Sequence, residues 1–385
     1  MQFPQYHDGS LLNLIASFLA SRGGRPAHPS LAALPPASIE GVRNIVFMLV
    51  DGLGYNYLAR VGRGGALREY LAGRITSVYP STTASAITTS FTGRSPTEHG
   101  LIGWHGWFPE AGVVAAPLPF RRRGDEVPLV SLDIRPSALL PNESVFDAMP
   151  CKSFVVSQRR IVDSEYSVHM GGRARRLGYD NLSGMVDAID AVVRSGSERK
   201  YLYAYYPEFD TVSHVHGVGS SQAAKRFAAI DEAFSQLLKR LVGTDTVLVM
   251  SADHGFIDTP RSQALELGDH PELVRLLRLP LTGEPRVAFC HVVPGAADDF
   301  MGRARSVLGG LADVRPSREL VDAGWFGPGA AHPRLAERVG DVALVMHEHA
   351  TIKDRVPGEN AHVMVGNHGG ATEDEMFVPL VVARL

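Results

Sequence analysis

Four short segments of the 385-residue sequence place aspartate and histidine side chains where they could bind metal ions. Carboxylate oxygens and imidazole nitrogens together suit zinc or manganese. Taken singly, each segment is equally typical of a helix cap, a surface hydrogen bond or a turn. Together they offer two ions three protein ligands each, an open coordination that is typical of catalytic metals. The candidate ligands are Asp51, Asp210, His214, Asp253, His254 and His368.

The spacing within two of these segments constrains the backbone. Asp210 and His214 are four residues apart, so a helix would place both on one face, whereas His216 would point elsewhere and at best lie behind the ligands. Asp253 and His254 are adjacent, so both can reach one ion only where the chain turns sharply, as the glycine that follows them permits. Metal binding by these pairs therefore requires a helix at the first pair and a tight turn at the second.

A run of hydroxyl side chains between the first and second segments offers a nucleophile. Residues 79–93 read YPSTTASAITTSFTG. A hydroxyl is a poor nucleophile until a base or a metal removes its proton, and a helix N-terminus at this point would add amide donors for an anion. An ordinary Ser/Thr-rich helix cap is the alternative. Residue types alone leave four candidates: Ser81, Thr82, Thr83 and Ser85.

Apolar runs predict the strands that position these residues. A continuous run rich in Ile and Val is typical of a strand buried on both faces of a parallel sheet, and ligands bind beyond the carboxyl ends of such strands. A helical pattern over 221–241 and the alternation of strands with helices predict an α/β fold, a central mostly parallel sheet flanked by helices. Pro379 predicts that the closing run, 376–383, is an edge or irregular strand. The other predicted strands are 44–50, 153–156, 200–205, 246–250 and 342–346.

Composition and charge limit the class of protein. With 45% hydrophobic and 21% charged residues, a disordered or fibrous chain is excluded, and a net charge of −3 provides no single-sign field for a nucleic-acid polymer or an anionic membrane. The apolar run 11–20 is too short to span a bilayer and predicts a packed amphipathic helix in a cytoplasmic protein. We expect this helix and an irregular arm over 1–43, followed by a single α/β metallohydrolase domain over 44–385 in which 261–359 elaborates the sheet or caps the site. The basic triplet 121–123 predicts a solvated loop.

The order of these motifs resembles the alkaline phosphatase superfamily, and within it the nucleotide pyrophosphatase/phosphodiesterase family, also called type I phosphodiesterases. The resemblance runs from about Asn44 to Leu385 and rests on Asp51-Gly, the block YPSTT…FTG…HG, Asp210-x-x-x-His214, Asp253-His254-Gly255 and His368-Gly369. It implies an alkaline-phosphatase-like sandwich that holds two divalent ions, zinc in the first place and manganese as the alternative. One ion would be bound by Asp210, His214 and His368, and the other by Asp51, Asp253 and His254 together with the nucleophile, Thr83.

The same resemblance implies an activity. It is the hydrolysis of phosphodiester or nucleotide pyrophosphate bonds through a phosphothreonine intermediate, with a small phosphoester such as a nucleotide as substrate. Two departures from the family pattern concern the substrate: Ser85-Ala86-Ile87 replaces Pro-Asn-His, and no asparagine follows His99-Gly100 to contact a phosphoryl oxygen. Trp104 and His105 are candidates for the border of the pocket. The alternatives are a phosphomonoesterase of the same superfamily and a metal- or nucleotide-binding module without turnover; no oligomeric state is indicated.

Overall fold

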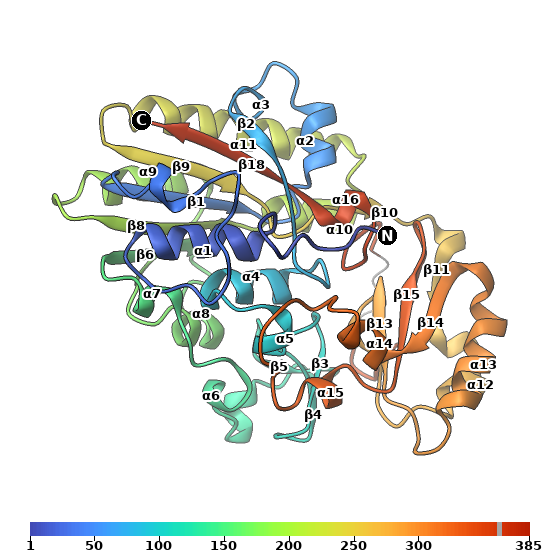
Figure 1. Cartoon of the computed structure of the whole chain (residues 1–385). Coiled ribbons are helices and arrows are strands. Elements are labelled where there is room, and N and C mark those ends of the chain that lie inside the picture. Colours follow the sequence, from blue (N-terminus) through green and yellow to red (C-terminus); the bar gives the residue numbers. More distant parts are fainter. Residues whose placement is uncertain (360–363) are drawn as a thin grey trace.

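A seven-stranded sheet forms the centre of the computed structural model, which describes residues 1–359 and 364–385 (Figure 1). β1 pairs in parallel with β8 and β9, and β6 pairs in parallel with β8 and β7, whereas β18 runs antiparallel to β9 and β2. The predicted mostly parallel sheet is confirmed. In order across the sheet, the strands are β2 (Leu71–Thr76), β18 (Phe377–Arg384), β9 (Thr246–Ser251), β1 (Asn44–Val50), β8 (Lys200–Tyr206), β6 (Lys152–Gln158) and β7 (Arg175–Tyr179).

Helices cover both faces of this sheet. Figure 1 shows α1 (Leu11–Ser21) and α4 (Thr83–Thr92) on one side, and α9 (Leu182–Arg194) and α11 (Ser221–Arg240) on the other. Because α11 buries apolar side chains at three- and four-residue spacing, the helix predicted over 221–241 is confirmed. The remaining helices outside residues 261–316 are α2 (Tyr55–Val61), α3 (Ala66–Glu69), α5 (Pro96–His99), α6 (Pro136–Leu139), α7 (Val145–Ala148), α8 (Glu165–Met170), α10 (Glu208–His216), α14 (Ser317–Asp322), α15 (Leu335–Arg338) and α16 (Glu373–Met376).

The closing strand β18 does not lie at an edge, so that part of the prediction is wrong. It stands between β2 and β9. Pro379 pairs with Arg74 of β2, while pairing with β9 begins only at Val381, after a shift of register between Leu380 and Val381. The proline is tolerated because it lies in the part of the strand that has a single neighbour, where one ladder hydrogen bond fewer is needed.

Residues 261–359 contain a second sheet of four antiparallel strands. Its order is β12 (Thr282–Glu284), β13 (Val287–Cys290), β15 (Val342–Met346) and β14 (Ala312–Pro316). The apolar run 342–346 is thus a strand as predicted, but it belongs to this sheet, because such a run signals burial and not a particular partner. The helices α12 (Pro271–Val274) and α13 (Ala297–Leu308) share a separate apolar core with it. The division of the chain into an arm and one metallohydrolase domain stays a prediction.

The N-terminal helix α1 is buried on nearly all sides instead of being amphipathic. Residues that follow it fold back over it: the Asn13 side chain donates to the Pro29 carbonyl at 2.8 Å, and the Leu31 amide donates to the Asn13 carbonyl at 3.0 Å. A polar residue inside the helix is therefore satisfied by the arm, which also covers the face expected to meet solvent. Among the described residues, no helix is both long and apolar enough to cross a membrane.

Candidate functional site

Three neighbouring strands of the central sheet deliver most of the candidate ligands to one edge. β1 ends at Val50, directly before Asp51, and β9 ends two residues before Asp253 and His254. β8, on the other side of β1, leads into α10, which carries Asp210. Because β9, β1 and β8 are adjacent and parallel, their carboxyl ends bring these side chains together.

The remaining two histidines arrive from α10 and from a short strand. α10 is the helix that this spacing requires, and His214 Nε2 lies 3.2 Å from Asp210 Oδ1 on the same face, while His216 is exposed and takes no part. His368 follows β17 (Gly366–Asn367), which pairs with β10 (Ile257–Asp258) just beyond β9. The His214 imidazole meets the carbonyl of Gly366 at 2.9 Å, so helix and strand fix each other.

These side chains form two overlapping clusters. Asp51, Asp253 and His254 offer ligand atoms that lie within 4.8 Å of one another, and so do Asp210, His254 and His368. His254 Nε2 lies 3.3 Å from Asp51 Oδ1, and its ring stacks on that of His368 with centroids 3.6 Å apart. Geometry thus brings all six predicted ligands together, with His254 between the two groups.

The buried oxygens of the three aspartates fit divalent cations. Asp51 Oδ1, Asp210 Oδ1 and Asp253 Oδ2 have no hydrogen-bond donor among the described residues. The other oxygen of Asp253 accepts from the backbone N–H of Gly52 at 2.9 Å, which turns Oδ2 toward the cluster. Buried carboxylate oxygens without donors are costly unless a cation meets them, so the donor set suits two metal ions.

The electrostatics of the site agree with this interpretation. Burial, followed by the charge of Asp210, raises the pKa of Asp51 well above its ordinary value, and burial with the charge of Asp51 does the same for Asp253. Burial also lowers the pKa of His368, which the neighbouring His254 and His214 lower further. Divalent cations would stabilise the carboxylates of Asp51 and Asp253 in their charged form, and a neutral His368 imidazole can bind them.

The structure separates the four candidate hydroxyls. Ser81 donates to the Gly370 carbonyl at 2.7 Å, Ser85 donates to the Leu101 carbonyl at 2.9 Å, and Thr82 donates to the Glu284 carboxylate. Only the Thr83 hydroxyl among them faces the clusters, with Oγ1 3.2 Å from His254 Nε2. Thr83 is the first residue of α4, and the Thr82 side chain does not cap that helix. The first amides of α4 are therefore open to an anion beside the hydroxyl.

A cavity of about 510 Å³ opens in front of Thr83, Asp210, His214 and His368. Trp104 and His105 border it, as the sequence suggested, and residues 281–285 and 352–359 supply another part of its wall. The region 261–359 thus contributes directly to the surroundings of the clusters. The sequence did not single out the individual residues of 281–285 and 352–359, because these irregular segments carry no motif.

Two side chains of this wall make contacts that the sequence did not predict. Arg123 is not solvated: its side chain is 7% exposed and pairs with Asp354 and Glu359, each at 2.7 Å. Glu284 accepts from the Thr82 hydroxyl and, at 2.6 Å, from the Trp104 amide, and burial raises its pKa to about 7. The partners of both side chains are distant in the sequence, so no local pattern could have predicted these contacts.

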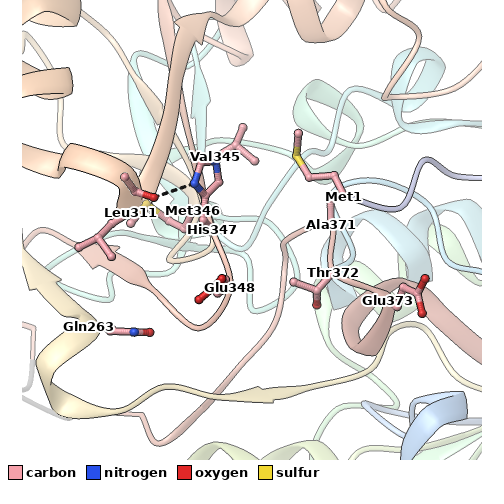
Figure 2. Close-up of a pocket in the computed structure, with 11 residues that line it drawn as sticks. Met1, Gln263, Leu311, Val345, Met346, His347, Glu348, Ala371, Thr372 and Glu373 are labelled. Carbon is pink, nitrogen blue, oxygen red and sulfur yellow. Dashed lines mark hydrogen bonds between the residues drawn. The ribbon is translucent and has the colours of Figure 1, made fainter.

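A second cavity, of about 580 Å³, holds none of the cluster residues (Figure 2). It lies between Met1 and residues 345–348, and its His347 imidazole meets the Gly310 carbonyl at 2.8 Å. We therefore place the candidate active site in the first cavity, where the clusters and the free hydroxyl meet.

Comparison with known families agrees with the motif order and the geometry. The family model described as type I phosphodiesterase/nucleotide pyrophosphatase matches residues 45–371. The chain belongs to this family. It is thus a member of the alkaline phosphatase superfamily, in a family of metal-dependent phosphoester hydrolases, and it carries two candidate Asp/His metal clusters. No curated protein matches the sequence significantly.

Solved structures of this family and of a related hydrolase share the fold. An inactive variant of murine ectonucleotide pyrophosphatase/phosphodiesterase 5 in complex with AMP has a TM-score of 0.66 and 17% identity, covering 87% of each chain. The human protein of the same name has a TM-score of 0.65 and 15% identity, covering 88% of this chain and 87% of its own. Phosphonoacetate hydrolase from Sinorhizobium meliloti 1021, in complex with phosphonoacetate, has a TM-score of 0.62 and 18% identity, covering 89% of this chain and 90% of its own. At these identities the similarity concerns the fold.

Proposed function

We propose that this chain is a two-metal hydrolase that cleaves phosphodiester or nucleotide pyrophosphate bonds through a covalent phosphothreonine on Thr83. The observation that supports this most is the position of the Thr83 hydroxyl. It is free of the competing hydrogen bonds that occupy its neighbours, lies 3.2 Å from His254 Nε2, and opens on the same cavity as Asp210 and His368. Membership of the type I phosphodiesterase family supports the reaction class.

The proposed ligand sets keep the division that the family resemblance implies. Zinc suits these donors best, and manganese is the second choice. Two such ions would lower the pKa of a bound hydroxyl and neutralise charge on phosphoryl oxygens. One set would be Asp210, His214 and His368; the other would be Asp51, Asp253, His254 and the Thr83 oxygen.

The reaction would proceed in two steps, formation and hydrolysis of the phosphothreonine. The Thr83 oxygen attacks phosphorus and loses its proton, the bond from phosphorus to the leaving oxygen breaks, and a phosphothreonine diester forms. Water then attacks phosphorus, the bond to Thr83 Oγ1 breaks, and the hydroxyl regains a proton. The open amides at the start of α4 would stabilise the added negative charge on phosphoryl oxygens in both steps.

We propose a small phosphoester as substrate, with a nucleotide as one candidate. Two proteins with this fold hold AMP and phosphonoacetate in their crystal structures, both small phosphorus-containing anions. The cavity of about 510 Å³ has room for a ligand of that size.

The test is hydrolysis of bis-p-nitrophenyl phosphate against p-nitrophenyl phosphate by chelator-stripped protein to which zinc or manganese is returned. Preference for the diester, together with loss of more than a thousandfold in kcat for Thr83→Ala, is the expected result. Preference for the monoester would replace the proposal with a phosphomonoesterase. Tight zinc binding without cleavage of either ester would indicate a binding module.

A further inference from the structure

One cationic side chain in the wall of the active-site cavity has no partner within residues 1–359 and 364–385. Lys353 ends β16 (Thr351–Lys353), which pairs with β11 (Ala264–Glu266), and it lines the same cavity as Thr83. Its ammonium makes no hydrogen bond or ion pair with any residue that the structure describes, although the residue is half-buried. A charge withdrawn from water without a partner is costly, so such a group is commonly kept for a ligand.

The other cations of the cavity are already neutralised. Arg123 forms ion pairs with Asp354 and Glu359, and Arg355 pairs through two nitrogens with Glu266, both at 3.1 Å. Their guanidinium groups are therefore engaged in holding the wall together. Of the three Lys and Arg side chains that line this cavity in the described part of the chain, Lys353 alone is available to an anion.

The nearby carboxylates do not satisfy Lys353 because each has another partner. The charges that act on it are those of Glu266, Glu284 and Glu359. Glu266 is held by Arg355, Glu359 by Arg123, and Glu284 by the Thr82 hydroxyl and the Trp104 amide. They lower the cost of keeping the ammonium charged, but none of these three carboxylates forms a hydrogen bond or ion pair with it, although Glu266 is its neighbour in the strand pairing.

Lys353 and the groups proposed to react come from different parts of the chain. The clusters and Thr83 come from the strand ends of the central sheet, whereas Lys353 comes from residues 261–359 on the part of the wall that this region supplies. A substrate whose phosphate lay at the clusters would place its remaining part toward this wall.

We propose that Lys353 binds a second anionic group, a phosphate or a carboxylate, on the part of the substrate that does not react. A compact ammonium with three donors suits either group as a point charge. The proposal rests on the function proposed above in that the reacting phosphate occupies the clusters. Among diesters, it makes those with no other charge poorer substrates than those that carry an anionic group on the part that does not react.

Binding to Thr83→Ala protein supplied with zinc tests this without requiring turnover. Isothermal titration would compare two pairs of probes that differ in the second anionic group: α,β-methylene-ADP against AMP, and phosphonoacetate against methylphosphonate. In each pair the first probe bears the additional group. Lys353→Gln, added to Thr83→Ala, should weaken one of the two first probes roughly tenfold or more and change its counterpart less than twofold. Whichever probe responds identifies the group as phosphate or carboxylate.

Lys225→Gln is the matched control, since it removes the same charge from an exposed position on α11 that does not line the cavity. It should change the affinity for all four probes less than twofold. The proposal is wrong if Lys353→Gln changes both members of each pair equally, if it has no effect, or if neither first probe binds more tightly than its counterpart. Failure of the wild-type enzyme to hydrolyse esters would refute the proposed function and leave this binding result to stand by itself.

Discussion

Removing one carboxylate from the clusters should have opposite effects on stability with and without metal. In chelated protein, Asp51 and Asp253 are buried acids whose ligand oxygens lie within 4.8 Å of each other, and burial raises the pKa of both. Asp51→Asn removes one charge while keeping the shape and the oxygen that accepts from the Tyr205 hydroxyl. The chelated variant should therefore be more stable than chelated wild type.

The magnitude follows from the separation of the charges. Two unit charges at the separation given by that limit, in an effective dielectric of about 20, repel by roughly 3 kcal/mol. Protonation of one acid relieves part of this, so the full value is an upper bound that is approached at high pH. For a chain of this length, about 3 kcal/mol corresponds to a rise in Tm of about 4 °C.

With zinc the order should reverse. Ligand binding stabilises the native state by about 4 kcal/mol at a free concentration a thousandfold above Kd, and a variant with one ligand fewer loses much of that gain. The assay is thermal unfolding of both proteins at pH 8, in chelator and in added zinc. A chelated Asp51→Asn protein that melts at or below the temperature of chelated wild type would refute the electrostatic reasoning, and an equal response to zinc would refute the assignment of Asp51 as a ligand.

Three further outcomes are expected. Burial raises the pKa of Glu284 from 4.5 to about 7, so the folded state holds this proton more strongly than the unfolded state. The unfolding free energy of chelated protein should therefore fall by about 3 kcal/mol as the pH rises through this window. Urea unfolding of Glu284→Gln should lack that slope. Arg286→Met leaves the buried carboxylate of Glu375, which Arg286 contacts at 2.9 Å, without its cationic partner. The variant should lose about 3–5 kcal/mol of unfolding free energy in urea, and adding Glu375→Gln should restore part of that loss. A Cβ at Gly255 would stand 2.0 Å from the Asp374 carbonyl oxygen, so Gly255→Ala should displace the adjacent ligand pair and weaken zinc binding more than tenfold by titration calorimetry; unchanged affinity would contradict this.

Five of the seven strands of the central sheet were predictable because they are continuous apolar runs, whereas β2 and β7, which are not, were missed. The run Asn44–Val50 is buried along its whole length, and a run of that kind followed by Asp-Gly indicates both the strand and the site at its end. Which strands pair with one another was not predictable. Nothing in residues 342–346 distinguishes a strand of the central sheet from one of the second sheet, and nothing around Pro379 shows that only one neighbour reaches it.

The candidate ligands could be proposed for a similar reason, since most stand in a short motif at a strand end or in a glycine-rich turn, while Asp210 and His214 have the spacing of one helix face. The choice of Thr83 over its neighbours depended on the family resemblance, because Ser81, Thr82 and Ser85 are occupied by groups far away in the sequence. The same holds for Lys353: its lack of a partner becomes visible only when distant arginines and carboxylates are seen to pair with each other.

The central claim is that Thr83 carries the phosphoryl group during turnover. The most direct measurement is rapid mixing of zinc-loaded enzyme with excess bis-p-nitrophenyl phosphate, followed by acid quenching and mass spectrometry of the peptide that contains Thr83. We predict a burst of p-nitrophenol that does not exceed one equivalent of enzyme and a p-nitrophenyl phosphoryl adduct on Thr83, both absent from Thr83→Ala. Full turnover by Thr83→Ala, or an adduct on another residue, would contradict the account.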